Sequence, residues 1–532
     1  MIPEPADDNK EERERRMLAD EEEQMRATET GRSKPARWLA LLAVVALTVA
    51  ACAGETTDTT GTTSGAADTT EATEETTATT EASTDTTAAS GESIKLGILA
   101  ECEGAFGGFN EDVVAGVTLA LINHAGATSN SPTTALDGFA NAVAGGREIE
   151  LVGIGCGDDT ADRIIQEIRT LVEENGAEIV IGPLSGDESI AVANYAKDHP
   201  EITVLSGIAG AQETTLQVQA PNYFRFHGDG AQWNAGLGDI LHNQAGWDTA
   251  AVIADDYSFG WTSSAGFIAD FCAVGGTIAP EARIYPPLGT TDYSSFIQQL
   301  PDPDEVDGYF WVVGGTGTTA ALEAFVNAKG ELTGDQHAGN LFFNPGLAST
   351  LGPGIAGAYV GGFASPPGDV TSPEIDEYLA SADAAWETLA GALSGNEPAP
   401  PSVAAAFGFF YGYYGGGVAL VNALNAVEGD LSNNHEALRA ELAGMTLELP
   451  YGPVSLDENR HGIVDVYLSQ LVLDGEEVVQ KTVALIPQVD QTFGGTFSAD
   501  TPGPSRDFPG CETADLPWSG NAIPVVDGVP QE

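Results

Sequence analysis

From Ile94 onward, short runs of apolar residues alternate with amphipathic segments. This alternation is typical of βα units around a parallel sheet. Residues 162–174 show the helical period, because Ile164, Ile168 and Leu171 fall on one face while charged residues occupy the other. We therefore predict an α/β fold for this part of the chain.

The predicted strands are the apolar runs at 94–99, 149–154, 179–181, 203–205, 250–254, 308–313, 341–343 and 359–363. The predicted helices lie at 112–123, 162–174, 189–197, 232–243, 261–272, 293–300, 319–328, 375–389, 403–426 and 434–442. In open parallel sheets, ligands bind outside the carboxyl ends of the strands. The loops that leave those ends are short and rich in Gly, Ser, Asp and aromatic residues, at 101–110, 185–188, 206–210, 255–259, 314–317 and 344–347.

The first 52 residues predict a leader and an exported chain. Basic residues precede an apolar stretch at 38–51, which is shorter than the roughly 20 residues of a membrane-spanning helix. The sequence Val49-Ala50-Ala51-Cys52 resembles a bacterial lipobox. We expect Cys52 to carry lipid, to begin the mature chain and to anchor it outside the cytoplasm on the bacterial cell membrane. The alternative is an ordinary signal peptide with a coincidental Cys.

Residues 53–92 are almost wholly Thr, Glu, Ala, Asp, Ser and Gly. They include no aromatic or large aliphatic side chain that a core could bury. We expect a disordered, self-repelling tether between the lipid anchor and the folded part.

The 532-residue chain has 79 acidic and 20 basic side chains and a formal net charge of −59. Because charged residues are only 19% of the total, the acidity reflects a shortage of Lys and Arg, and a packed core remains possible. Nucleic-acid binding requires clustered Lys and Arg, and the sequence has no basic stripe after Arg37. We therefore expect no nucleic-acid partner.

Five motifs follow one another along the chain: IKLGIL at 94–99, IGPLS at 181–185, DDYSFG at 255–260, TDYSSF at 291–296 and GPVSLD at 452–457. Together and in this order they resemble the motifs of type I periplasmic binding proteins. Among these, the resemblance is to the branched-chain amino acid (Leu/Ile/Val) class that serves ABC transporters.

The resemblance implies two doubly wound α/β lobes that are joined by a three-crossing hinge and close over a ligand. Lobe 1 would comprise 93–227 and 365–457, and lobe 2 with the hinge would comprise 228–364 and 458–490. Residues 128–145 are interpreted as an inserted surface loop. Residues 491–532, rich in Pro and Gly, are interpreted as a C-terminal extension that lies over the surface.

Four cysteines remain besides Cys52, and an even number in an exported chain suggests two disulfides. In the topology that the resemblance implies, Cys102 and Cys156 follow the ends of neighbouring strands, and we predict a bond between them at the rim of the cleft. Cys272 would then pin the C-terminal extension through Cys511. A metal site is the alternative, but the cysteines lack CxxC spacing and nearby His.

The sequence contains no Walker A, HExxH or GxSxG motif. A GxGxxG match at 352–357 precedes a predicted strand rather than a helix, so the helix terminus that would bind phosphate is missing. The glycines of GIGCG at 153–157 are interpreted as a tight turn. The seven histidines lack ligand spacing. We expect no enzyme activity, no cofactor and no bound metal.

In relatives that bind amino acids, lobe 1 groups hold the ligand carboxylate and a lobe 2 acid holds the ammonium. The resemblance aligns the first set with Gly186, Ile208 and Gly210, and the acid with Gly346, which follows Asn344 and Pro345. Asp187, Glu101 and Glu103 are candidates for a displaced carboxylate, although charges at a helix N-terminus or rim are an equal alternative. The aromatic cluster at 407–414 is assigned to the core. The candidate ligand-binding residues are Phe109, Ser185, Gly186, Asp187, Ile208, Gly210, Tyr257, Phe259, Thr316 and Asn344.

The sequence thus predicts an extracytoplasmic solute-binding lipoprotein of an ABC importer. It would act as a monomer, bind a small amino-acid-like or amide-like solute in the interlobe cleft, and contact permease subunits in the membrane. The alternative is a ligand-sensing ectodomain that signals to a membrane partner without transport.

Overall fold

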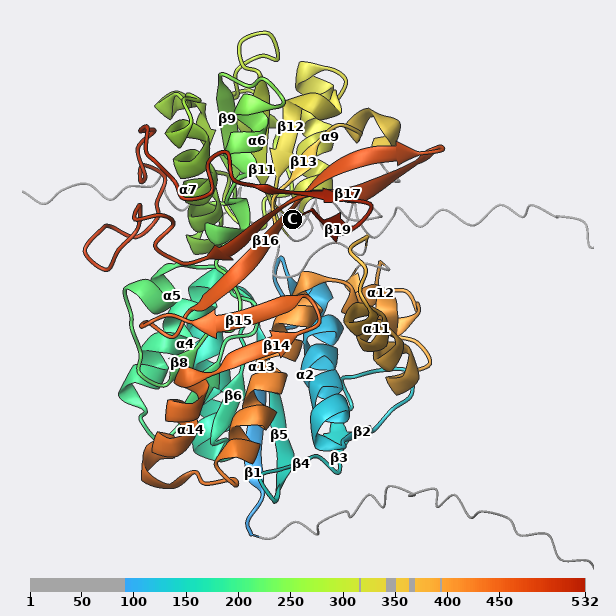
Figure 1. Ribbon diagram of the computed structural model, residues 1–532, viewed down its shortest axis with the longest axis vertical. Helices are drawn as coiled ribbons and strands as arrows, with labels where there is room; N and C mark the ends of the chain where they lie inside the picture. Colours follow the sequence, from blue (N-terminus) through green and yellow to red (C-terminus); the bar gives the residue numbers. More distant parts are fainter. Residues whose placement is uncertain (1–90, 315–316, 341–350, 363–368, 393–394, 532) are drawn as a thin grey trace, which may run out of the picture. The chain divides into compact units, whose positions relative to one another are not determined.

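The computed structural model describes residues 91–314, 317–340, 351–362, 369–392 and 395–531. Two large sheets with helices packed on them account for most of this region (Figure 1). The first sheet has the strand order β4-β5-β1-β6-β7-β8. Its strands are β1 (Ile94–Glu101), β4 (Val143–Ala144), β5 (Arg147–Gly157), β6 (Ile179–Ile181), β7 (Thr203–Leu205) and β8 (Tyr223–Phe224).

Alternation of side chains along the short parallel strands buries both faces of the first sheet. Ile179 and Ile181 belong to one core cluster, while Val180 between them belongs to another. The second of these clusters includes Ile164 and Ile168, which are the apolar face that the sequence predicts for this helix. The helices and helical turns in this part of the chain are η1 (Gly107–Phe109), α2 (Asn110–Ala125), α3 (Ala161–Arg169), η2 (Thr170–Glu174), α4 (Gly186–Asp198) and α5 (Glu213–Leu216).

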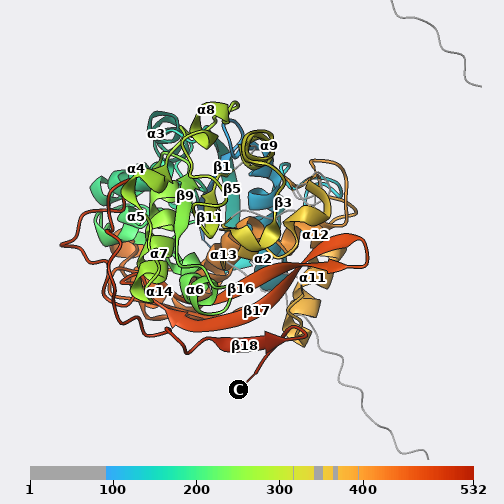
Figure 2. The ribbon, with the colours of Figure 1, turned by 90° about the horizontal axis from the view of Figure 1, so that it is seen from above.

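A later part of the chain returns to the first sheet. Helix α13 packs along α2, and both views show the two side by side (Figures 1 and 2). The hydroxyl of Tyr413 donates a hydrogen bond of 2.7 Å to the carbonyl oxygen of Leu99 in β1. This returning segment comprises α11 (Pro373–Ala385), α12 (Pro401–Ala405), α13 (Gly408–Ala426), α14 (Ser432–Gly444), β14 (Thr446–Leu449) and β15 (Gly452–Leu456).

The second sheet has the order β10-β9-β11-β12-β13-β16-β17-β18-β19, with β15 also paired to β16. Phe310 of β11 stacks on Phe267 of α7 with ring centroids 4.0 Å apart, while its neighbour Trp311 faces the opposite cluster. Its strands are β9 (Ala250–Ala254), β10 (Arg283–Ile284), β11 (Gly308–Val312), β12 (His337–Gly339), β13 (Tyr359–Val360), β16 (Gly462–Asp474), β17 (Glu477–Val489), β18 (Ile523–Val526) and β19 (Val529–Pro530). The accompanying helices and turns are η3 (Gln232–Asn234), α6 (Leu237–Asn243), α7 (Ser258–Ala273), η4 (Pro280–Ala282), α8 (Ser294–Ile297), α9 (Gly317–Lys329), η5 (Gly334–Gln336) and η6 (Gly352–Ile355).

Most predicted elements are present, and several differ in detail. The predicted helix at 232–243 is divided into η3 and α6. Gly236, which lies between them, has a φ of 81° that breaks the helix. The predicted helix at 403–426 is two helices, because Phe407 is extended between α12 and α13. The glycines at 153–157 lie inside β5 and not in a turn. The predicted strand at 341–343 lies outside the described residues.

The interpretation of 128–145 as a surface loop is wrong for much of its length. It forms a two-stranded hairpin of β2 (Thr128–Ser129) and β3 (Phe139–Ala140), and β4 pairs with β5 of the first sheet. Phe139 and Ala135 are buried in the main core. The segment therefore contributes apolar packing as well as surface.

The C-terminal residues are more integrated than a surface extension. Strand β18 pairs antiparallel with β17, and Figure 2 shows β16, β17 and β18 as successive strands. Phe493, Phe497 and Trp518 are buried. Within the described residues, no helix has the length and apolar character needed to cross a membrane.

Candidate functional site

Loops at the carboxyl ends of first-sheet strands bring three of the candidate residues together. Gly186 begins α4 after β6, and Ile208 and Gly210 follow β7. All three are buried. Parallel neighbouring strands end at the same edge of a sheet, which explains why these positions lie close in space.

The second sheet supplies the facing residues. Strand β9 is followed by Tyr257 and by Phe259 in the first turn of α7. Trp233 of η3 packs against Phe259, with ring centroids 5.4 Å apart. Tyr257 and Phe259 are each 5% exposed, so both rings are withdrawn from solvent.

Residues from both sheets line one pocket. It measures about 230 Å³ when the part open to solvent is included. Its lining is Phe106, Leu184, Gly186, Ile208, Gly210, Trp233, Tyr257, Phe259 and Phe409. Five of the ten candidate ligand-binding residues are in this set, and we call it the solute pocket.

Two glycines allow α7 to approach the first-sheet loops closely. A Cβ atom at Gly186 would lie 2.5 Å from Ser258 Oγ, and one at Gly210 would lie 2.5 Å from Phe259 Cδ2. The ring of Phe259 therefore stands over the position that the resemblance aligns with recognition of a ligand carboxylate.

The other candidates have different positions. Phe109 packs behind the pocket, with its ring centroid 4.6 Å from that of Phe409. Ser185 donates its backbone N–H to Glu101, and Asp187 Oδ1 accepts a 3.2 Å hydrogen bond from the backbone N–H of Ser258. Thr316 and Asn344 lie outside the described residues.

The polar group that Tyr257 contributes to the pocket is an uncharged hydroxyl. Burial raises the pKa of Tyr257 well above its ordinary value, and the negative charges of Asp255 and Asp159 add to this effect. The rest of the described lining consists of apolar side chains, the indole of Trp233 and glycine backbone. Such a surface suits a small solute with few charged groups.

Three buried carboxyl groups hold the loops that form the pocket wall. Glu101 Oε1 accepts from the backbone N–H groups of Leu184 (3.2 Å) and Ser185 (2.7 Å). Asp159 Oδ2 accepts from the N–H of Ala105 at 2.6 Å, next to the pocket residue Phe106. Glu188 Oε1 accepts from the N–H groups of Asp158 and Asp159.

Burial raises the pKa of all three groups, and the charge of Glu101 adds to the effect on Asp159 and Glu188. The pKa of Asp159 rises to about 7. Among the described residues no ion pair involves these carboxyls. The cluster therefore retains protons at neutral pH.

The disulfide pattern agrees with the prediction. Cys102 is bonded to Cys156, and Cys272 is bonded to Cys511. The first bond joins the loop after β1 to β5, close to the carboxyl cluster. The second joins α7 to the C-terminal residues.

Sequence reasoning missed Phe106, Leu184, Trp233 and Phe409. Phe106 and Leu184 lie in a predicted binding loop and a family motif, so adjacency could have indicated them. Phe409 was assigned wholly to the core, whereas it also lines the pocket. Within the described residues there is no cluster of His, Cys, Asp and Glu that could hold a metal ion.

Comparison with known proteins gives a consistent result. The model of the periplasmic binding protein family matches residues 93–476. No curated protein sequence matches the chain.

Solved structures share the fold at low sequence identity. An ABC transporter substrate-binding protein from Sphaerobacter thermophilus has a TM-score of 0.59 and 22% identity, covering 75% of this chain and 99% of that one. A solute-binding protein from R. palustris in complex with benzoate has a TM-score of 0.59 and 21% identity, covering 75% and 97%. A leucine-binding protein from Thermotoga maritima has a TM-score of 0.55 and 16% identity, covering 74% and 99%.

Proposed function

This chain belongs to the periplasmic binding protein family, and from that premise we propose that it is the solute receptor of an ABC importer. It binds a small solute between two lobes and presents the closed form to a membrane permease. The observation that carries the proposal is the solute pocket, whose walls come from the strand-end loops of both sheets.

We propose the lobes and hinge at the boundaries that the sequence suggests. The strands of the first sheet all lie in 93–227, and the helices of 373–444 pack with them. The second sheet takes β9 to β13 from 228–364 and β16 and β17 from 458–490. A parallel bridge between Arg225 and His461 joins two of the proposed crossings. This arrangement supports closure of one lobe on the other around the pocket.

The pocket favours a solute with an aromatic or aliphatic body and few charged groups. An amino acid would need a partner for its ammonium, since a buried charge without one is costly. The described lining has no carboxylate, and Asp187 is not part of it. The benzoate named with the R. palustris structure has an aromatic body and a single charged group.

Isothermal titration of the purified full-length chain tests this proposal. The probes are benzoate, 4-hydroxybenzoate and leucine, and we expect the aromatic acids to bind more tightly than leucine. Replacing Leu184 by Trp fills the pocket and should abolish binding. Leu136→Trp, which adds the same bulk to a side chain that is 41% exposed, should leave it unchanged. Tighter binding of leucine, or equal binding by Leu184→Trp, would contradict the proposal.

Transport and sensing make different predictions in cells. If the chain serves an importer, its deletion should abolish uptake of a labelled solute that binds the pocket. Uptake that persists while a transcriptional response to the solute disappears would favour the sensing alternative.

We further propose that Cys52 carries the lipid that holds the protein at the outer face of the cell membrane. The proposal is supported by the order of basic residues, apolar stretch and small residues before Cys52. Labelled palmitate should appear on the parent chain and not on Cys52→Ala. Absence of label from the parent would refute lipidation.

We assign no catalytic role to the solute pocket. Its nine described lining residues contain one hydroxyl, on Tyr257, and no base to activate it.

A further inference from the structure

A second pocket lies where strands β15 and β16 diverge. The two strands pair only through Ser455 with Ile463 and Leu456 with Gly462. Beyond these pairs β16 joins β13 and β17, so residues 452–454 and 464–467 separate. Pro453 has no backbone N–H with which to continue the pairing.

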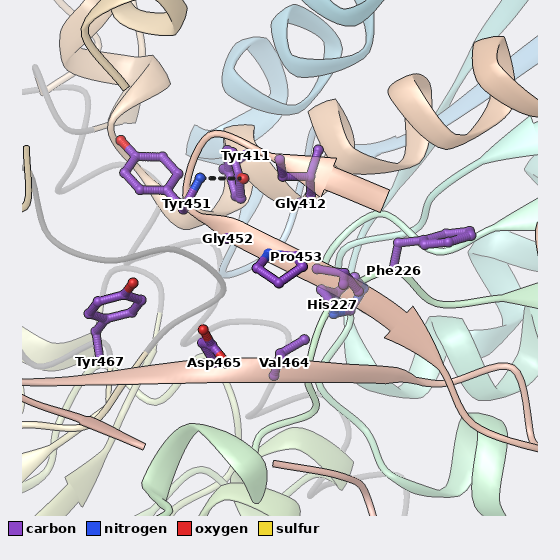
Figure 3. Close-up of a pocket in the computed structure, with 12 residues that line it drawn as sticks. Phe226, His227, Tyr411, Gly412, Tyr451, Gly452, Pro453, Val464, Asp465 and Tyr467 are labelled. Atoms are coloured by element: carbon purple, nitrogen blue, oxygen red, sulfur yellow. Dashed lines mark hydrogen bonds between the residues drawn. The ribbon is translucent and has the colours of Figure 1, made fainter. Parts of the chain in front are cut away.

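This space, which we call the fork pocket, measures about 420 Å³ when the part open to solvent is included. Figure 3 shows the side chains around it, with Asp465 and Tyr467 rising from β16 toward Tyr451 and Pro453. Its lining is Phe226, His227, Tyr411, Gly412, Leu449, Tyr451, Gly452, Pro453, Val454, Val464, Asp465 and Tyr467. Only described residues form it, and none of them lines the solute pocket.

Asp465 is half-buried, and one of its carboxylate oxygens has no partner among the described residues. Its Oδ1 accepts hydrogen bonds from the backbone N–H and the side-chain amide of Gln488, at 2.9 and 3.0 Å. No hydrogen bond or ion pair reaches Oδ2 from the part of the chain that the structure describes. This oxygen points across the fork, 3.6 Å from where a Cβ atom of Gly452 would stand.

Three tyrosines line the same pocket as that carboxylate. The ring centroids of Tyr411 and Tyr451 are 4.7 Å apart, and Tyr411 Oη accepts a hydrogen bond from the backbone N–H of Tyr451. Tyr451 is 6% exposed, and its own hydroxyl has no partner among the described residues. Burial raises the pKa of the Tyr467 hydroxyl, and the nearby carboxylate of Asp465 raises it further.

The pocket has no positive charge of its own. Its lining contains no Lys or Arg, and His227 is its only basic side chain. Burial lowers the pKa of His227 to about 3, and its two ring nitrogens face Gly228 O and Ser206 Oγ. The imidazole is therefore neutral and does not compete for Asp465.

We propose that the fork pocket is a second binding site, for a small organic ammonium ion with an apolar body. The ammonium pairs with Asp465 Oδ2, and tyrosine rings cover the apolar part and attract the cation through their π-faces. An occupant would touch Tyr451 on one side of the proposed hinge and Asp465 on the other. Its binding is therefore coupled to lobe closure, and each ligand changes the affinity of the other by the same factor.

Calorimetric titration of the full-length chain with phenethylammonium at pH 7 tests the site. We expect one saturable site, and a loss of about tenfold or more in affinity for Asp465→Asn, because a charge-assisted hydrogen bond is replaced by a neutral one. Asp474→Asn is the matched control, since it removes the same charge from the exposed end of the same strand. The uncharged isostere 2-phenylethanol should bind at least tenfold more weakly than phenethylammonium.

A second variant separates the two pockets. Leu184→Trp fills the solute pocket and should leave a phenethylammonium site in place. The proposal is overturned if the parent chain does not bind phenethylammonium, if Asp465→Asn binds as the parent does, or if Leu184→Trp alone abolishes binding. Failure of benzoate to bind would contradict the proposed solute and leave this test unaffected.

Discussion

The indole Nε1 of Trp518 donates a 2.5 Å hydrogen bond to Oδ1 of Asp270, a carboxyl group that is fully buried in α7. Asp270 Oδ2 accepts a second bond, from the backbone N–H of Asp239. Trp518 lies beyond the residues that the family model matches. The C-terminal residues therefore satisfy a buried acid in the second sheet's helical layer.

Replacing Trp518 by Phe should lower the free energy of unfolding by about 1–3 kcal/mol, because a buried carboxyl oxygen loses its donor. Chemical denaturation of the purified chain measures the change. Trp247→Phe is the control, since the Trp247 indole donates a 2.9 Å hydrogen bond to a neutral carbonyl, that of Asp335. We expect the control to lose less, about 0.5–1.5 kcal/mol. Equal losses would show that the charge of Asp270 contributes nothing to this contact.

Loss of the Cys272–Cys511 bond should destabilise the chain by about 2–5 kcal/mol, the usual cost of removing a native disulfide. The bond closes a segment with a sequence separation of 239 residues. The test compares the melting temperature of the Cys272→Ala, Cys511→Ala double variant with that of the parent under non-reducing conditions. Reductant should lower the melting temperature of the parent more than that of the double variant. An unchanged melting temperature would mean that neighbouring contacts hold the C-terminal residues without the bond.

A methyl group at Gly210 should weaken solute binding. The new Cβ atom would meet the Phe259 ring at 2.5 Å, so α7 must move away for the lobes to close. Overpacking of this kind costs about 1–3 kcal/mol, which is about 5- to 150-fold in affinity. Titration of Gly210→Ala with the solute identified for the parent chain gives the value. Gly444→Ala, where nothing lies within 4 Å of the added atom, should bind as the parent does.

The predictable part of the fold is the part with local signals. The strands at 179–181, 203–205 and 250–254 are short apolar runs between turns, and the structure has them at those bounds. The β16–β17 hairpin was not predicted, although Asp474-Gly475 is a typical turn signal and Gly475 has a φ of 66°. The break before α13 has no such signal, because Phe407 is extended where its ring stacks on distant Phe109.

The residues of the solute pocket likewise divide into those that the sequence indicates and those that it does not. Gly186, Ile208 and Gly210 follow strands that neighbour one another, so their proximity follows from the order of the sheet. Trp233 and Phe409 come from η3 and α13, which reach the pocket only through packing of distant segments. One-dimensional patterns carry no information on such packing, and both residues were missed.

The carboxyl cluster predicts a stability that falls as pH rises. The pKa of Asp159 is about 7 in the folded chain, and about 3.9 is usual for an unfolded one. Between these two pH values the folded state holds more protons than the unfolded state. The stabilisation that Asp159 contributes is therefore fully present below about pH 4 and is lost as pH rises through 7. Raised pKa values of Glu101 and Glu188 act in the same direction. Each extra proton contributes a slope of about 1.4 kcal/mol per pH unit.

Glu188→Gln should reduce this slope. The amide keeps an oxygen for the N–H groups of Asp158 and Asp159 and offers Glu101 a permanent donor in place of a proton. We expect the variant to match the parent at pH 5 and to equal or exceed its stability at pH 8, as measured by urea unfolding at both values. Glu103→Gln, on the exposed part of the neighbouring loop, should follow the parent at each pH. If Glu188→Gln is less stable than the parent at pH 8 by several kcal/mol, the carboxylate is required in its ionised form and the cluster does not share protons.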